Sequence, residues 1–197
     1  MTTEDSPFGS LQGSFGASRP APAPTGVDYT HAQEADLRQL LETGLGATTT
    51  GAQLLQFAAQ QRIVTRIIKG KNSSGFIPES RAVFIALPPE LSTPSSEAIL
   101  ELGAFLRQAQ LQILGHKNPD ESMTSLDKAV AFDSKMLDSI VIMCKIASEH
   151  YENGHSDFVD ALIRMGHGEL YKSYIEQGSG TQLVDLFYKL YIEVVKT

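Results

Sequence analysis

Apolar and polar residues follow two different periods along this chain. Between residues 63 and 87 the apolar positions run together or alternate, and many are β-branched, which is typical of strands. From residue 95 onward they recur every three or four positions, as on one face of a helix. Two shorter helical patterns come first, at 34–43, where Gly44 is expected to end the helix, and at 50–61.

The strand patterns cover residues 63–69, 75–77 and 81–87 and are separated by turn-forming residues. No connection between them is long enough for a crossover helix, so we expect an antiparallel meander of about three strands and no parallel pairing. The later helical patterns cover 95–114, 124–152, 157–165, 169–176 and 181–195. The predicted fold class is therefore α+β, with a small antiparallel meander packed with helices and a mostly helical C-terminal half.

The apolar stripes of the longer helices predict what each helix buries. Helix 95–114 carries Ile99, Leu102, Leu106, Ala109 and Ile113 on one face. The stripe of helix 124–152 comprises Leu126, Ala129, Val130, Asp133, Leu137, Ile140, Cys144, Ala147 and Tyr151. The last helix carries Leu183, Phe187, Leu190 and Val194, a face that either docks within the chain or forms a dimer.

Composition divides the chain into a tail and a folded part. Residues 1–30 are rich in Gly, Ser, Pro and Ala, so we expect a disordered tail there and a single domain over 31–197. Phe8 and Phe15 stand in small aromatic units of this tail, which are either a short docking motif or incidental residues.

Charge and cysteine content restrict the class of protein. The net charge of −7 argues against a nucleic-acid surface, and the one compact basic stretch, 62–71, is typical of a protected strand edge. Cys144 is the only cysteine, so no intrachain disulfide can form. The sequence shows neither a signal peptide nor an apolar run of about 18 residues, so we expect a cytoplasmic protein without a membrane span.

Asp133 is the charged residue within the apolar stripe of helix 124–152. A buried carboxylate costs several kcal/mol unless it is paired or hydrogen-bonded, so Asp133 should have a partner. Two interpretations follow: a structural hydrogen bond that ties the helix to a loop, or a residue that supports a functional site.

Glu101 lies one position before the stripe of helix 95–114 and is either a solvated helix residue or a catalytic base. A catalytic base that activates a metal-bound water needs metal ligands beside it. Ala98 and Ala104 lie three positions from Glu101, and Glu97 and Phe105 lie four positions from it. None of these residues is a histidine or cysteine that could bind zinc.

His150, His155 and His167 form the only cluster of histidines along the sequence. A zinc site needs three or four ligands in tetrahedral geometry. A helix end at Asn153–Gly154 separates the first two histidines, so the i, i+4 geometry of one helix is not available to them. Histidines that cap helices or lie on the surface are the alternative interpretation.

Several segments together resemble an uncharacterised bacterial family of zincin-like metallopeptidases. Residues 50–58, 63–64 and Gly75-Phe-Ile-Pro-Glu-Ser-Arg-Ala-Val-Phe-Ile-Ala-Leu-Pro-Pro89, followed by helix 95–114, match its order of helix, small sheet and His-Glu-x-x-His helix. Residues 126–135 stand where that family has an Asn-Arg-Ala-x-Glu-Ala-Asp-Ala-like motif, and 147–162 and 171–176 are also similar. The resemblance covers roughly residues 35–180 and rests on ordered segments and not on one motif.

The sequence departs from the family at the residues that carry its chemistry. In one register Leu102 and Leu106 replace the two histidines and Gly103 the glutamate; shifted by one, Glu101 matches the glutamate, but Leu100 and Ala104 replace the histidines. In the downstream motif Ala131 replaces the acidic residue, whereas Asp133 keeps the aspartate. Without both imidazoles the remaining groups cannot complete a tetrahedral zinc site.

Three hypotheses follow. The first is a pseudoenzyme: a zincin-like domain that has lost its zinc ligands and acts as a non-catalytic binding or regulatory module, with a protein partner and no cofactor, zinc being the cofactor of the ancestral family. In this case Glu101 and Asp133 are vestigial. The second is a metal-dependent hydrolase with a relocated site, built from His150, His155 or His167 and the nearby Glu152, Asp157 or Glu169. The third is a structural or partner-docking protein. None of them fixes an oligomeric state.

Overall fold

The computed structural model describes residues 31–69, 73–88, 93–115 and 125–192 of the 197-residue chain, and within these ranges it leaves aside the side chains of 31–32, 69, 125–133 and 192. Residues His31–Thr197 form one compact unit. The other unit, Met1–Thr30, is the predicted tail and lies outside the described residues, as does Val194. The predicted disorder of the tail, the role of its aromatic units and the place of Val194 on the last helix therefore stay predictions.

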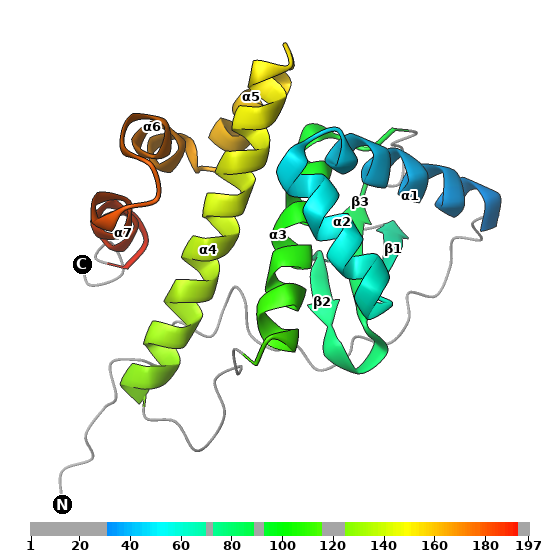
Figure 1. Cartoon of the computed structure of the whole chain (residues 1–197), viewed down its shortest axis with the longest axis horizontal. Helices are drawn as coiled ribbons and strands as arrows, with labels where there is room; N and C mark the ends of the chain where they lie inside the picture. Colours follow the sequence, from blue (N-terminus) through cyan, green and yellow to red (C-terminus); the bar gives the residue numbers. More distant parts are fainter. Residues whose placement is uncertain (1–30, 70–72, 89–92, 116–124, 193–197) are drawn as a thin grey trace, which may run out of the picture. The chain divides into compact units, whose positions relative to one another are not determined.

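The described part is α+β, as predicted, with helices in the majority (Figure 1). Its helices are α1 (His31–Gly46), α2 (Thr49–Gln61), α3 (Ser96–Ile113), α4 (Ser125–Glu152), α5 (Asp157–Arg164), α6 (Gly168–Gln177) and α7 (Thr181–Phe187). Its strands are β1 (Val64–Lys69), β2 (Gly75–Ile77) and β3 (Ala82–Leu87). A turn of 3-10 helix, Pro78–Ser80, joins β2 to β3, and a π-helical segment, Tyr188–Ile192, follows α7.

The sheet is mixed, so the predicted antiparallel meander is wrong. The strand order is β1-β3-β2, with β3 antiparallel to β2 and parallel to β1. Val64 pairs with Ala82 and Lys69 with Leu87 in the parallel ladder. A parallel pair needs a crossover of about a dozen residues. Here β2 itself lies in that crossover, so no helix is required, and the tight turn at 78–80 returns the chain to the centre of the sheet.

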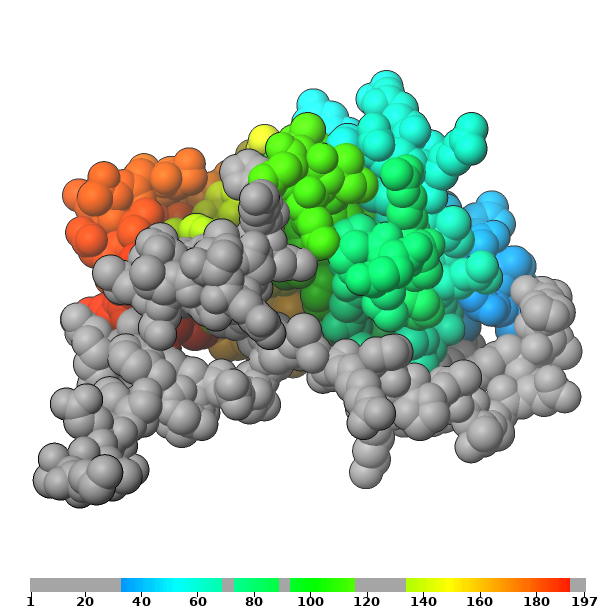
Figure 2. Space-filling view, turned by 90° about the horizontal axis from the view of Figure 1, so that it is seen from below, coloured from blue at the N-terminus to red at the C-terminus, as the bar shows by residue number. Residues whose placement is uncertain are grey.

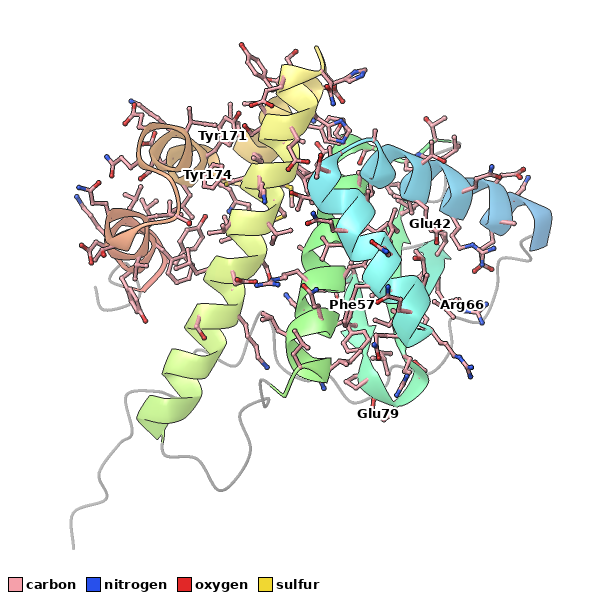
Figure 3. All side chains as sticks on the ribbon, viewed as in Figure 1. Glu42, Phe57, Arg66, Glu79, Tyr171 and Tyr174 are labelled. Carbon is pink, nitrogen blue, oxygen red and sulfur yellow. The ribbon has the colours of Figure 1, made fainter. Side chains whose placement is uncertain are left out.

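One face of the sheet packs against α1, α2 and α3, which lie in front of the strands in Figure 1. Val83, Ile85 and Leu87 of β3 belong to the same buried cluster as leucines from all three helices. The central helix of this cluster is α3, which contacts α1, α2, α4, α5, β2 and β3. Figure 3 shows the side chain of Phe57 on the part of α2 that faces α3.

Helix α1 continues through Gly44, so the expectation that this glycine ends the helix is wrong. The glycine allows α1 to approach α3 closely, because a Cβ at this position would lie 2.5 Å from Cδ1 of Ile99. A glycine within a helix costs about 1 kcal/mol relative to alanine. This cost is acceptable where two helices would otherwise be kept apart.

Helix α4 lies beside α3, and α5, α6 and α7 complete the helical half (Figure 1). The predicted stripe of α4 holds at Ile140, Cys144 and Ala147, which are buried, but it ends at His150 and not at Tyr151, which is 60% exposed. Tyr171 and Tyr174 of α6 lie on the side of that helix near α4 (Figure 3) and pack against the core.

The last helix docks within the chain, as expected for its apolar face. Leu183 and Phe187 are buried in the main core cluster. In the part of the chain that the structure describes, no helix combines the length and apolarity that a membrane crossing requires. The cytoplasmic location stays a prediction.

Candidate functional site

Glu101, the expected vestigial base, lies half-buried on α3 and holds the start of β2. Its Oε2 accepts a 2.5 Å hydrogen bond from the hydroxyl of Ser74, and that hydroxyl oxygen accepts a 3.0 Å bond from the backbone N–H of Ala86. Burial raises the pKa of Glu101; the Ser74 hydrogen bond opposes this shift and the charge of Glu97 adds to it. Glu101 is therefore a link between α3 and the sheet, and the expectation of a solvated side chain is wrong.

Two leucines that follow Glu101 on the apolar stripe of α3 are part of the hydrophobic core. The side chains of Leu102 and Leu106 are 0% and 1% exposed and belong to the main buried cluster. At Gly103 an added Cβ would overlap Cδ1 of Ile146, so α4 closes against this part of α3. These residues do not fit zinc, because neither the leucines nor the glycine offers a donor atom.

Asp133 belongs to α4, but the structure does not describe its side chain. Its expected partner therefore stays a prediction.

His150 is a buried residue, contrary to the expectation of a capping or surface histidine. Its side chain is 3% exposed, and its ring stacks on Phe158 with 3.6 Å between ring centroids. Neither ring nitrogen forms a hydrogen bond with any described residue. Burial lowers its pKa, as does the nearby His155, whereas Asp157, the Gly44 backbone carbonyl and Glu149 oppose the shift. The ring is thus held as a neutral, largely apolar group.

The structure does not bring the three candidate histidines together. The rings of His150 and His155 lie 6.0 Å apart, and His155 is exposed. His167 instead pairs through Nδ1 with the hydroxyl of Tyr191 at 2.7 Å, and this hydroxyl donates to the Gly166 carbonyl at 3.0 Å. Among the described residues no three His, Cys, Asp or Glu side chains converge as metal ligands would. The hydrolase with a relocated site at His150, His155 or His167 stays a prediction.

The hydrogen bond to Tyr191 and burial also determine the protonation state of His167. The Tyr191 hydroxyl donates its proton to the Gly166 carbonyl, so it can only accept from His167. The Nδ1 of a neutral His167 ring therefore carries the ring proton and donates it to Tyr191. Burial lowers the pKa of His167, which keeps the ring neutral. The residue joins the start of α6 to the end of the described chain.

Cys144 is wholly buried on α4, and burial raises the pKa of its thiol to about 12. A nucleophilic or metal-binding cysteine needs an accessible thiolate. Cys144 therefore acts as a small core residue, as its place in the stripe predicts.

Sequence reasoning missed Glu149. Its carboxylate accepts two hydrogen bonds from Thr50: the backbone N–H donates to Oε2 at 2.9 Å and the hydroxyl donates to Oε1 at 2.5 Å. Thr48 accepts from the N–H of Gly51 at 3.0 Å, so two of the free N–H groups at the start of α2 are satisfied. Local sequence patterns could not indicate a cap from a residue 99 positions away.

A pocket of about 250 Å³ lies beside this contact, between α2, α3 and α4. Its lining is mostly polar: Thr50, Gln53, Leu54, Arg107, Gln110, Ile142 and Lys145. Arg107 forms an ion pair with Asp138, with 2.6 Å between Nε and Oδ2, and also binds Gln110. The Arg107 guanidinium is thus engaged within the chain. The pocket offers no acid, base and nucleophile in mutual contact.

Comparison with family models, with curated proteins and with solved structures gives no match for this chain.

Proposed function

We propose that this chain is a non-catalytic binding or regulatory module, derived from a zincin-like metallopeptidase that has lost its zinc ligands. One observation supports the proposal: Leu102 and Leu106, which the resemblance aligns with the family's two histidines in one register, are 0% and 1% exposed within the core. A histidine at either position would place its ring nitrogens in a packed apolar cluster. Burying these nitrogens without hydrogen-bond partners costs several kcal/mol. The helix thus serves the core and not a metal.

The other groups with chemical capability support the same proposal, because each has a structural role. Glu101 accepts its hydrogen bond from Ser74, His167 binds Tyr191, and His150 stacks on Phe158. A catalytic base must reach its substrate's proton directly or through one water molecule. In this conformation each of these side chains contacts another residue of the same chain.

Metal analysis of the full chain, purified without a histidine tag, tests this proposal. We expect less than stoichiometric zinc, no cleavage of an unstructured casein substrate, and no change in either for Glu101→Gln. Glu176→Gln, an exposed change on α6, is the matched control. Stoichiometric zinc that is lost on changing Glu101 or Asp133 would refute the proposal.

The second experiment separates this module from a relocated hydrolase. We expect His150→Phe, His155→Asn and His167→Phe, made one at a time, to leave the zinc content unchanged. Loss of zinc and of casein cleavage in the same variant would favour the hydrolase.

A further inference from the structure

Strand β3 is apolar on both of its faces. Its sequence, Ala-Val-Phe-Ile-Ala-Leu, contains no polar residue, and alternate side chains of a strand lie on opposite sides of the sheet. Val83, Ile85 and Leu87 lie in the core under the helices. Ala82, Phe84 and Ala86 therefore lie on the other side. Strands that are apolar throughout are typical of sheets covered on both faces.

The neighbouring strands continue this second face. In register, Val64 and Ile77 flank Ala82, Arg66 and Gly75 flank Phe84, and Ile68 lies beside Ala86. We call these eight residues the outer sheet face. Val64 and Ile77 are 39% and 40% exposed. Ile68, Phe84 and Ala86 are half-buried and Ala82 is 4% exposed, but none of the eight belongs to the main core cluster under the helices among the residues that the structure describes. Figure 2 shows the β2–β3 hairpin, teal to green, at the surface beside α3.

The segment of the sequence that forms the sheet is basic. Residues 62–87 include Arg62, Arg66, Lys69, Lys71 and Arg81, against Glu79 as the one acidic residue of that segment, in a chain whose net charge is −7. Arg66 extends from β1 in Figure 3 and is exposed on the outer sheet face. The guanidinium of Arg81 is held by the carbonyl of Gln61 at 2.9 Å, at the end where β1 and β3 begin. The charge of this region is thus opposite to that of the whole chain.

We infer that the outer sheet face binds an amphipathic helix of a partner protein, with acidic residues on the flanks of its apolar stripe. The inference rests on the proposed function and adds the class of partner. A helix buries one apolar stripe, and helices are the elements that cover the faces of parallel strands. Acidic flanks complement Arg62, Arg66 and Arg81.

Two other occupants fit less well. A second copy placed face to face would bring the arginines of both copies together, and like charges across an interface are costly. A nucleic acid needs clustered phosphate contacts, whereas Arg66 is the only basic residue among the eight of this face and the others are apolar or Gly.

Binding of designed helical peptides to the full chain tests the inference. The probe is a labelled amphipathic peptide of about 18 residues, or five turns, with leucines on one face and glutamates on its flanks; a second peptide has lysines in place of the glutamates. Fluorescence anisotropy should show saturable binding of the acidic peptide and binding at least about tenfold weaker for the lysine peptide.

Variants of the outer sheet face localise the binding. Arg66→Glu and Ile77→Ser should each weaken binding of the acidic peptide by about tenfold. Lys172→Glu and Ile175→Ser, exposed residues of the same types on α6, should leave it unchanged. Circular dichroism checks that each variant is folded.

Three results would overturn the inference. These are equal binding of both peptides, a dimer in sedimentation that Ile77→Ser dissociates, or an oligonucleotide that binds in preference to the acidic peptide. Each leaves the non-catalytic proposal intact, because that proposal depends on zinc content and casein cleavage.

Discussion

The carboxylate of Glu149 binds both the backbone N–H and the hydroxyl of Thr50, at 2.9 Å and 2.5 Å. Thr50 is the second residue of α2, where backbone N–H groups have no partner within the helix and the helix dipole is positive. A carboxylate from α4 thus caps a helix in the other half of the sequence. The contact joins the helices next to the sheet to the helical C-terminal half.

Loss of the Glu149 carboxylate should destabilise the chain. We expect Glu149→Ala to lower the free energy of unfolding by about 2 kcal/mol, because Thr50 is buried and would keep two unsatisfied donors. Glu149→Gln should cost less, since its amide oxygen can still accept one bond. Urea unfolding measures both, with Glu152→Ala as an exposed control on the same helix. Equal losses for Glu149→Ala and Glu152→Ala would show that the cap contributes nothing.

Gly51 should tolerate no side chain. A Cβ there would overlap the backbone carbonyl of Leu45 and approach the Thr48 hydroxyl, so the α1–α2 connection would have to move. We expect Gly51→Ala to cost about 2–3 kcal/mol in thermal or urea unfolding. Gly46→Ala is the matched control, because its Cβ would meet only the flexible end of Leu55 at 3.4 Å, and it should be neutral or slightly stabilising. The prediction fails if both variants unfold at the same urea concentration.

Burial of His150 should make stability depend on pH. Burial lowers its pKa in the folded state below the ordinary value of 6.5, so at pH values below about 6.5 the unfolded chain binds more protons than the folded one. Stability then falls as the pH falls from about 6.5 through the lowered pKa, with a slope of at most about 1.4 kcal/mol per pH unit for one proton.

His150→Phe should remove this contribution, because the new ring can still stack on Phe158 and does not titrate. Urea unfolding at several pH values between about 5 and 8 would give the wild-type and variant curves. The difference between the two isolates His150 from His167, whose pKa burial also lowers. Parallel curves would contradict the prediction.

The sequence predicted the kinds of element better than their partners. The all-apolar Ala82–Leu87 segment indicated a strand, but periodicity does not say which strand lies beside it or in which direction. The parallel pairing of β1 with β3 depends on β2 being placed at the far edge, and the short link of 70–74 carries no signal for this. The passage of α1 through Gly44 likewise depends on Ile99, 55 residues later in the sequence.

The candidate site was predictable only where the signal was local. The leucines at 102 and 106 follow the helical stripe and lie in the core as that stripe predicts. The expectation that His150 caps a helix or lies on the surface rests on its place near the helix end at Asn153–Gly154, which does not show the face on which its side chain lies. Glu149 is polar and lies within the same turn, so nothing near it in the sequence indicated Thr50 as its partner.

The sequence separation of 99 between Thr50 and Glu149 also sets the earliest time at which their contact can form during synthesis. A ribosome adds about 5–20 residues per second, so roughly 5–20 s of synthesis separate the two residues. During that interval the N–H of Thr50 can bind only water or a temporary partner. Helices α1–α3 and the sheet are complete in the chain at Ile113, 36 residues before Glu149, so the nascent chain exposes this part of the core for about 2–7 s before α4 can close over it.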